Sequence, residues 1–424
     1  MVHRKPTSEK IAFVMVGLPA RGKSYIARKL ARYLHWLGHE TRVFNVGSYR
    51  RELLGAQKTN EFFSPDNPEG SALRLKVAEV ALDDMLGWFE RGLAIGIYDA
   101  TNSTASRRKM VRDRCEAAGI EVVFVETVCD DPGVVDRNVR ETKLFSPDYA
   151  GVAPEEAVRD FLARIAHYER AYETVTDAEG ADVKLNDEGS KVVAHEIDGA
   201  VPARAVFFLM NLQTRTRTVW LTRHGESVFN VEDRVGGDSD LSPRGVAYAR
   251  SLAAFMESRR AAEDEAEIVV WTSQLRRTVQ TAAYLPESPS AWRALNEIDA
   301  GVCDGMTYSE IRKQYPYDFA ARAEDKLGYR YPRGESYADL IQRLEPMIIE
   351  TERCERPVLV IGHQAVLRAL YAYLMDIPPG ECPFLPMPLH TVLKLTPTTY
   401  GCEETRVVLG PNADARDSKT PPPP

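Results

Sequence analysis

The sequence has few cysteines and no long apolar run, and each shortage excludes a class of protein. Six cysteines are scattered along 424 residues without a CxxC pair, so neither a disulfide framework nor a cysteine-based zinc site is expected. No stretch approaches the roughly 18 apolar residues that a membrane helix needs. The opening MVHRKPTSEK lacks the apolar core of a signal peptide. These absences predict a cytoplasmic protein without a membrane partner.

Positive charge is also in short supply. The chain has 54 Lys and Arg against 62 Asp and Glu, and its formal net charge is −8. This balance argues against nucleic acid or an anionic membrane as the main partner. It does not exclude small anionic substrates, because a local basic pocket needs only a few arginines.

The arrangement of apolar runs indicates two α/β halves. In the first half, strand-like runs at 11–16, 42–46, 93–99 and 121–128 alternate with helical patterns. One pattern covers 24–37, and another places Leu73, Val77, Val80 and Trp88 on one face. Alternating strands and helices predict a parallel sheet with helices on both faces. The length is that of two or three domains.

A second set of elements begins near residue 217. Strand-like runs at 218–222, 267–273, 357–362 and 391–396 alternate with helices expected around 243–260, 275–284, 336–353 and 364–375. The polar, basic segment QTRTRT at 213–218 is the expected seam. We therefore predict α/β domains at 1–215 and 216–410. The Pro-rich tail, 411–424, is expected to be disordered.

A phosphate loop opens the first domain. GLPARGKS, residues 17–24, matches G-x-x-x-x-G-K-[ST] between a buried strand and an amphipathic helix. Backbone N–H groups of such a loop surround phosphate oxygens, Lys23 reaches the β- and γ-phosphates, and Ser24 can ligate Mg²⁺. The helix N-terminus adds a favourable dipole. The alternative is a Gly-rich turn that binds nothing.

Other polar residues of this half have two interpretations each. Asp99 ends an apolar run, so it could coordinate Mg²⁺ or accept the proton of an attacking hydroxyl, or it could cap the following helix. Several basic residues could hold an anionic acceptor, since guanidinium groups match phosphate geometry, or they could be solvated surface charges. These are Arg50, Arg74, Arg107, Lys143 and Arg164, with Tyr168 four residues after Arg164 on the same helical face.

Two histidines follow strands of the second half in matching contexts, VWLTRHGES and VLVIGHQAV. If the strands are neighbours in a parallel sheet, His224 and His363 meet at its carboxyl edge. A neutral imidazole can attack phosphorus and become phosphohistidine. Arg223 would disfavour the protonated ring and hold phosphoryl oxygens, Arg277 offers a second clamp, and Glu297 is a candidate general acid. Structural histidines or a histidine–carboxylate metal site are the alternatives, although the spacing matches no known metal pattern.

From about residue 10 to 410 the chain resembles the bifunctional 6-phosphofructo-2-kinase/fructose-2,6-bisphosphatase family. The resemblance rests on long strings, among them MVGLPARGKSYIARKL, FNVGSYRRE, YDATN, KLFSPDY, RHGES, WTSQLRRTVQTA, ALNEIDAGVCDGMTY and GHQAVLRAL. The second half alone is similar to the histidine phosphatase (phosphoglycerate mutase-like) superfamily. The resemblance implies a P-loop kinase domain followed by a histidine phosphatase domain.

The resemblance also implies roles for individual residues of the first half. Asp99 and Cys129 match kinase active-site positions, beside Lys23. The implied nucleotide-binding residues are Gly17, Leu18, Pro19, Ala20, Arg21, Gly22, Lys23, Ser24, Tyr25, Asn138 and Lys143. The implied contacts to fructose 6-phosphate are Arg50, Arg74, Thr101, Arg107, Lys143, Arg164 and Tyr168. Mg²⁺ would arrive with ATP at Ser24, with Asp99 as a second candidate ligand.

In the second half, His224 matches the phosphohistidine and Glu297 the proton donor, and no metal is expected. The implied residues around the transferred phosphoryl group are Arg223, Asn230, Gly236, Arg277 and His363. The implied contacts to the rest of the sugar bisphosphate are Tyr308, Arg322, Lys326, Tyr337, Gln364 and Arg368. The family further implies a homodimer through the kinase domains, and opposed synthesis and hydrolysis of fructose 2,6-bisphosphate. An enzyme with one silent half and a non-catalytic sensor of ATP and sugar phosphate remain as alternatives.

Overall fold

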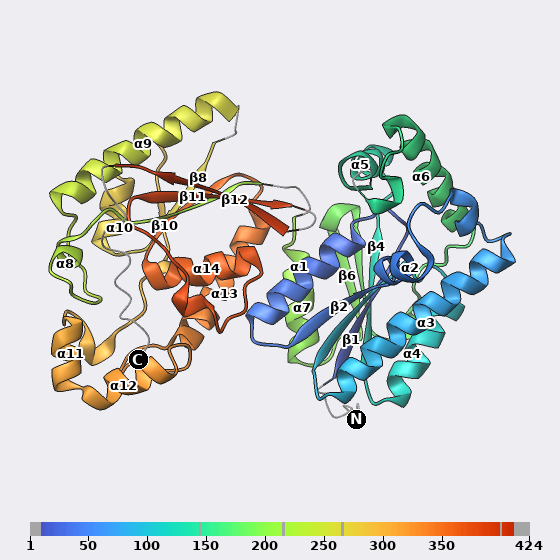
Figure 1. Cartoon of the computed structure of the whole chain (residues 1–424), viewed down its shortest axis with the longest axis horizontal. Helices are drawn as coiled ribbons and strands as arrows, with labels where there is room; N and C mark the ends of the chain where they lie inside the picture. The colour runs from blue at the N-terminus through green and yellow to red at the C-terminus, as the bar shows by residue number, and fades with distance from the viewer. Residues whose placement is uncertain (1–9, 144–145, 214–216, 264–266, 399–400, 411–424) are drawn as a thin grey trace. The chain divides into compact units, whose positions relative to one another are not determined.

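The computed structural model describes residues 10–143, 146–213, 217–263, 267–398 and 401–410 (Figure 1). The chain divides into two compact units, Met1–Thr214 and Arg215–Pro424. The predicted boundary after residue 215 and the predicted tail at 411–424 fall on residues outside the described ranges. Each unit is built around one six-stranded sheet.

The sheet of the first unit has the order β2-β3-β1-β4-β5-β6. Its strands are β1 (Ile11–Val16), β2 (Thr41–Asn45), β3 (Ile95–Asp99), β4 (Glu121–Val128), β5 (Asp182–Asn186) and β6 (Lys191–His195). Every residue of β1 is buried, as expected for a parallel strand covered on both faces. The first five strands run parallel, which places their carboxyl ends at one edge.

The expectation of a wholly parallel first sheet is wrong for its outermost strand, β6. This strand runs antiparallel to β5, because the short turn η5 (Asp187–Gly189) joins the two strands as a hairpin, whereas a parallel return needs a longer crossover. The sequence analysis missed both strands, since their letters, DVKLN and KVVAH, mix polar with apolar residues.

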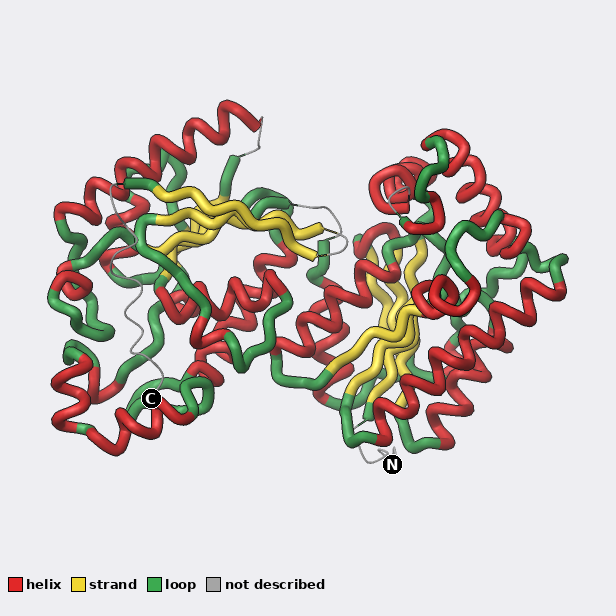
Figure 2. The backbone as a smooth tube through the Cα atoms, in the orientation of Figure 1, coloured by secondary structure: helices red, strands yellow, loops and turns green. Residues whose placement is uncertain are grey.

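Helices cover both faces of the first sheet, with α1 and α7 on one side and α3 and α4 on the other (Figures 1 and 2). Tyr33 of α1 stacks on Phe208 of α7 at a centroid distance of 4.4 Å. The pattern that predicted a helix over Leu73–Trp88 is confirmed, but Val80 is 37% exposed rather than buried. The helices are α1 (Lys23–Trp36), α2 (Val46–Leu54), α3 (Pro68–Glu90), α4 (Ala105–Ala117), α5 (Pro132–Asn138), α6 (Pro154–Glu169) and α7 (Ala200–Met210).

The second unit has a mixed sheet of order β12-β11-β7-β10-β8-β9. The strands β7, β10, β8 and β9 run parallel, while β11 is antiparallel to both of its neighbours. The strands are β7 (Val219–Arg223), β8 (Val269–Thr272), β9 (Ser290–Ala291), β10 (Val358–Gly362), β11 (Thr391–Thr398) and β12 (Gly401–Val408). The adjacency of β7 and β10 is the feature on which the predicted histidine pair depends.

Helices also lie on both faces of the second sheet, with α9 on one side and α14 on the other (Figure 1). Trp220 of β7 packs in one cluster with Tyr248 and Leu252 of α9. Helix α13 begins at a capping box in which Ser336 and Asp339 satisfy each other's backbone N–H groups. The helices are α8 (Val228–Val231), α9 (Pro243–Glu263), α10 (Arg276–Ala282), α11 (Tyr308–Gln314), α12 (Pro316–Glu324), α13 (Tyr337–Arg353) and α14 (Gln364–Met375).

Two expectations about composition can be compared with the structure. All six cysteines are free thiols. Among the described residues, no helix combines the length and the apolar character needed to cross a membrane.

Candidate active sites

The loop between β1 and α1 has the backbone that a phosphate cradle needs. Gly17 has φ +139°, and a Cβ there would lie 2.6 Å from the carbonyl oxygen of Thr127, so only glycine fits. Gly22 precedes α1 in the left-handed region, with φ 78°. Ala20 also has positive φ, at 59°. The loop therefore turns sharply at three points before the helix begins, as the motif predicts.

Hydrogen bonds to three segments, two from side chains and one between backbones, hold this loop. Lys23 is buried, and its ammonium group donates to the carbonyl oxygen of Leu18. Asn138, at the end of α5, donates from Nδ2 to the carbonyl oxygen of Ala20 at 3.1 Å. The backbone N–H of Gly17 donates to the carbonyl oxygen of Thr101 at 2.9 Å. The structure thus brings Asn138 and Thr101 to the loop, although both lie far from it in the sequence.

Ser24 and Asp99 are joined by a residue that the sequence analysis did not name. Asn45 ends β2 directly opposite Asp99 on β3. Its Nδ2 donates to the Asp99 carboxylate and lies 3.4 Å from Ser24 Oγ. A hydroxyl and a carboxylate within reach of one amide nitrogen form a small set of hard oxygen donors, which suits Mg²⁺. Asp99 is 3% exposed and does not cap α4, because Thr104 does.

The remaining predicted residues around the loop are less closely tied to it. Cys129 follows β4, beside the end of β1, and is buried. Arg21 forms an ion pair with Glu169 at 3.6 Å, and Tyr25 is half-buried near the ammonium group of Lys29. The side chain of Lys143, at the end of a short π-helical turn, lies outside what the structure describes.

Four arginines that sequence spacing could not connect form one cluster. Arg50 of α2 and Arg164 of α6 both face Asp148, at 2.6 and 3.6 Å. Arg107 donates to the backbone carbonyl of Arg74 at 3.3 Å. Burial, followed by the nearby Arg164 and Arg107, lowers the pKa of Arg74. One aromatic residue, Phe63, lies under Arg50 and Arg164 and beside Tyr168.

The distances to the Phe63 ring are 3.6 Å from Arg164 Cζ and 5.6 Å from Arg50 Cζ, with the Tyr168 ring centroid at 6.2 Å. Buried guanidinium nitrogens of this cluster have no hydrogen-bond partner among the described residues: Nε and Nη1 of Arg50, Nη1 of Arg107 and Nε of Arg164. Buried donors are normally paired. A cluster of unpaired cationic donors above an aromatic ring is suited to an anion such as a sugar phosphate.

In the second unit, His224 and His363 lie together as predicted. Strands β7 and β10 are adjacent and parallel, with Arg223 opposite Gly362. The backbone N–H of His224 donates to the carbonyl oxygen of Gly362 at 3.0 Å. The two rings are 5.1 Å apart between centroids and inclined by 55°. Both are at most 4% exposed.

The hydrogen bonds of His224 determine which nitrogen can react. Nδ1 donates to the carbonyl oxygen of Gly225 at 2.7 Å, so the lone pair is on Nε2. Arg277 Nε lies 3.2 Å from this Nε2. Burial, then Arg277 and Arg223, holds the pKa of His224 well below its usual value. The sequence analysis named Arg223 as the cause, but burial is the larger one. The ring is therefore neutral and can act as a nucleophile.

Two arginines and a tight turn lie around the His224 ring. Arg277 Nη1 donates to the carbonyl oxygen of Gly237 at 2.6 Å. Gly236 has φ +69°, and a Cβ there would overlap Asp304 Oδ1, so a larger residue would be strained and would force Asp304 to move. Arg223 is buried and donates to the carbonyl oxygen of Met387 at 2.9 Å. Asn230 uses its Oδ1 to accept from the backbone N–H of Ser227 at 3.0 Å, which fixes the loop after His224.

The second histidine is oriented by a residue that the sequence analysis overlooked. His363 Nε2 lies 2.8 Å from Ser273 Oγ, just after β8. If the hydroxyl donates, the ring proton is on Nδ1, which has no hydrogen-bond partner among the described residues. His363 can then donate to a phosphoryl oxygen. Ser273 stands in the quoted WTSQLRRT, but the serine had no distinguishing pattern there.

The side chain of Glu297 contacts the N-terminus of α14, the helix that begins directly after His363. Its Oε1 accepts from the backbone N–H of Ala365 at 3.2 Å, and its charge acts on Arg277. Gln364, the first residue of α14, is half-buried. The carboxylate therefore belongs to the same site as the histidine pair, where it can exchange a proton with the oxygen of a leaving group or of water.

The predicted contacts to the rest of a sugar bisphosphate form a basic and aromatic group. Arg368 donates to the Tyr337 hydroxyl at 3.2 Å, and Arg322 Cζ lies 5.5 Å from the centroid of the Tyr308 ring. Lys326 donates to the carbonyl oxygen of Pro383 at 2.8 Å. Burial, then Arg368 and Arg322, lowers the pKa of Lys326 to about 8. The charges of Arg322 and Arg368 thus act on Lys326, so the three basic residues lie near one another.

Comparison with known proteins assigns both halves of the chain to one family. The family model for 6-phosphofructo-2-kinase matches residues 1–216, and the model for branch 1 of the histidine phosphatase superfamily matches residues 219–409. A 6-phosphofructo-2-kinase/fructose-2,6-bisphosphatase from Gallus gallus is 48% identical over 405 residues, covering 94% of this chain and 85% of the relative. The chain belongs to the 6-phosphofructo-2-kinase/fructose-2,6-bisphosphatase family.

Two further relatives and one solved structure are also similar to this chain. An Arabidopsis thaliana protein named 6-phosphofructo-2-kinase/fructose-2,6-bisphosphatase is 50% identical, covering 94% of this chain and 54% of the relative. Human 6-phosphofructo-2-kinase/fructose-2,6-bisphosphatase 4 is 48% identical, covering 93% and 84%. The crystal structure of the alpha-ribazole phosphatase from Shigella flexneri is 21% identical with a TM-score of 0.41, covering 46% of this chain and 99% of that chain.

Membership of the family confirms the resemblance drawn from the sequence strings. This family member contains a kinase domain and a histidine phosphatase domain in a single chain. Four residues enter the candidate sites from the structure alone, namely Asn45, Phe63, Asp148 and Ser273. Asn45 and Asp148 lie in quoted strings, FNVGSYRRE and KLFSPDY, so the strings marked the segments but not the roles of the residues.

Proposed function

We propose that this chain synthesises fructose 2,6-bisphosphate from fructose 6-phosphate and ATP, and hydrolyses it back to fructose 6-phosphate and phosphate. The proposal is supported by the names of its relatives over most of its length. The observation that carries it is a phosphate loop with a neighbouring arginine cluster in the first unit, and a buried histidine beside Arg277 in the second. The two halves would run opposed reactions.

In the kinase half, Gly17–Ser24 would bind the phosphates of ATP and the arginine cluster would bind the 6-phosphate of the sugar. The 2-hydroxyl oxygen attacks the γ-phosphorus, the bond from that phosphorus to the β–γ bridging oxygen breaks, and Asp99 accepts the hydroxyl proton. Lys23 stabilises the charge that develops on the β–γ oxygens. Ser24 and Asp99 would hold Mg²⁺, which when bound neutralises phosphate charge.

In the phosphatase half, His224 Nε2 attacks the phosphorus of the 2-phosphate. The bond from phosphorus to the sugar oxygen breaks, and Glu297 gives that oxygen its proton. Arg223, Arg277 and His363 hold the phosphoryl oxygens during the transfer. Water then attacks the phosphohistidine, Glu297 takes a proton from it, and inorganic phosphate leaves with the Nε2 lone pair restored.

The test is to measure both reactions on one purified sample. Formation of fructose 2,6-bisphosphate from ATP and fructose 6-phosphate is expected, as is release of phosphate from fructose 2,6-bisphosphate without ATP. If only one reaction occurs under any condition, the chain has one silent half. If neither occurs while both ligands bind, the chain is a sensor rather than an enzyme.

Asn45→Ser should weaken the kinase reaction through the metal-binding residues. Serine retains an N-cap for α2 but removes the amide that lies between Ser24 and Asp99. We expect the Mg²⁺ concentration for half-maximal kinase rate to rise by roughly tenfold, the scale of outer-shell changes at metal sites. The matched control is Asn211→Ser, which removes an amide at the end of α7. Equal Mg²⁺ titrations for the two variants would remove Asn45 from the site.

Lys326 should make substrate binding in the phosphatase half depend on pH. Its pKa of about 8 means that the positive charge is lost as pH rises through that value. We expect KM for fructose 2,6-bisphosphate to rise several-fold between pH 7 and 9, and to rise less in Lys326→Arg, because arginine stays charged. Steady-state kinetics across this range, with Lys313→Arg as the surface control, will test this. A profile in Lys326→Arg identical to wild type would contradict it.

We also propose that the chain is cytoplasmic and forms a homodimer through its kinase domains, with neither nucleic acid nor membrane as a partner. Light scattering on the purified chain measures the mass directly. A monomer at micromolar concentration would contradict the dimer.

A further inference from the structure

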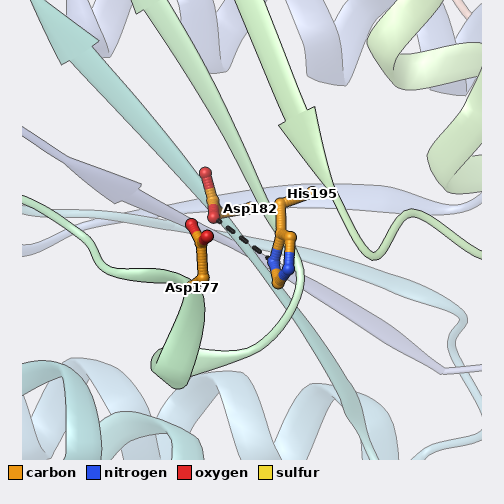
Figure 3. A group of neighbouring side chains, drawn as sticks. All are labelled: Asp177, Asp182 and His195. Carbon is orange, nitrogen blue, oxygen red and sulfur yellow. Dashed lines mark ion pairs between the residues drawn. The ribbon is translucent and has the colours of Figure 1, made fainter.

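Three side chains that belong to neither candidate active site meet at the hairpin that forms the edge of the first sheet. Asp177 comes from the short turn η4 (Asp177–Glu179), Asp182 begins β5, and His195 ends β6 directly opposite Asp182. One ligand atom from each lies within 4.8 Å of the other two. Figure 3 shows the two carboxylates and the imidazole turned toward one another. None of these residues has a part in the proposed reactions.

Asp182 has the surroundings of a ligand rather than of a structural carboxylate. It is 1% exposed, and neither carboxylate oxygen has a hydrogen-bond partner in the described part of the chain. Burial raises its pKa. A buried carboxylate without donors is costly and is rarely left so. The nearby Glu126 differs. Its carboxylate is equally buried but accepts hydrogen bonds from Tyr172, Thr174 and the backbone N–H of Val175.

The neighbouring cation does not remove this deficit. Lys184 donates to the carbonyl oxygen of Val175 and pairs with Glu126 at 3.6 Å. His195 Nδ1 is 3.9 Å from Asp182 Oδ1, which is too long for a hydrogen bond, and 3.3 Å from the carbonyl oxygen of Gly180. Neither Lys184 nor His195 therefore donates a hydrogen bond to the oxygens of Asp182.

We propose that Asp177, Asp182 and His195 bind a divalent transition-metal ion of the Zn²⁺ type. Zinc takes imidazole and carboxylate ligands at about 2.0–2.2 Å in a tetrahedral arrangement, which places ligand atoms about 3.3 Å apart. The three side chains need to close by about 1.5 Å at most from the separations found here. An imidazole ligand disfavours Mg²⁺ and Ca²⁺, which prefer all-oxygen sites. The Gly180 carbonyl or solvent would complete the coordination.

Such an ion would cross-link three segments of the first unit. It would join η4 to both strands of the hairpin at a sheet edge that no further described strand covers. The site is distinct from that of ATP, because β5 is separated from β1 by β4. An ion that binds only the folded chain stabilises it by mass action. The expected role is therefore stability of the kinase unit.

The experiment measures zinc binding to the full chain after removal of metals and dialysis against buffered Zn²⁺. Elemental analysis is expected to find one more zinc per chain in the wild type than in Asp182→Leu or His195→Ala. Zn²⁺ should raise the melting temperature of the wild type by several degrees more than that of either variant. His35→Ala, which removes a half-buried histidine of α1, is the matched control and should behave as wild type.

Each outcome decides the matter. Zinc bound at cysteines stays the same in all four proteins, so only the difference between them counts. Equal zinc content and equal thermal response in wild type and His195→Ala would overturn the proposal, even if Asp182→Leu failed to fold. A response to Mg²⁺ as large as that to Zn²⁺ would overturn the assignment of the metal class.

Discussion

His224→Ala is expected to abolish hydrolysis of fructose 2,6-bisphosphate and to leave the kinase reaction intact. The side chain supplies the lone pair that attacks phosphorus, from the Nε2 that lies 3.2 Å from Arg277 Nε. Loss of a nucleophile lowers kcat by at least about a thousandfold. Incubation with fructose 2,6-bisphosphate labelled in the 2-phosphate should give an acid-labile phosphoenzyme in the wild type and none in the variant.

The variant His363→Ala shows whether the nucleophile is His224 or the second histidine beside it. Its ring also lies in the site, 5.1 Å from that of His224, but Ser273 occupies its Nε2. We expect a slower reaction that still passes through a phosphoenzyme on His224. A phosphoenzyme that persists in His224→Ala would contradict the assignment.

The pH dependence of this step follows from the direction of the pKa shift. Because burial and two arginines hold the pKa of His224 well below 6.5, the ring stays neutral when the pH falls from 8 to 6.5. Phosphoenzyme formation should therefore not slow over this range for lack of the neutral form. A rapid-quench measurement that shows a loss with a midpoint near 6.5 would indicate an ordinary, exposed histidine.

Lys23→Met is expected to remove the kinase reaction and spare the phosphatase. Methionine is similar in length but carries no charge, so it cannot stabilise the developing charge on the β–γ oxygens of ATP. The ammonium group is buried in the loop and contacts the carbonyl of Leu18, which places it where the phosphates would lie. We expect kinase kcat to fall by about a thousandfold or more.

The control for this variant is Lys109→Met, which removes an exposed lysine on α4 paired with Asp113. It should leave both activities within twofold of the wild type. Formation of fructose 2,6-bisphosphate by Lys23→Met at a rate near wild type would show that the phosphate loop does not bind ATP in the proposed way.

The features predicted well from the sequence are those in which neighbouring residues carry the information. The phosphate loop is contiguous, and its glycines are required by backbone conformation at Gly17 and Gly22. The histidine pair needed one assumption, that β7 and β10 are neighbours, and the apolar character of both strands made a shared parallel sheet the natural arrangement.

The arginine cluster shows why other parts could not be predicted. Its members come from α2, α3, α4 and α6, and an arginine on a helix is usually solvated rather than buried. Only packing on Phe63 and pairing with Asp148 bring Arg50 and Arg164 together. The antiparallel edge of the first sheet and the Asp182 cluster were missed for the same reason, since β5 and β6 owe their pairing to a turn rather than to apolar runs.

By itself, the sequence determined that this chain has two α/β halves, one with a phosphate loop and one with two strand-end histidines, because these signals depend on local backbone geometry and on residues close in the chain. The tertiary structure decided which distant side chains share a site and which charges they carry there. Asn45 between Ser24 and Asp99, the neutral state of His224, and the unpaired carboxylate of Asp182 all follow from burial and from neighbours that sequence distance cannot specify.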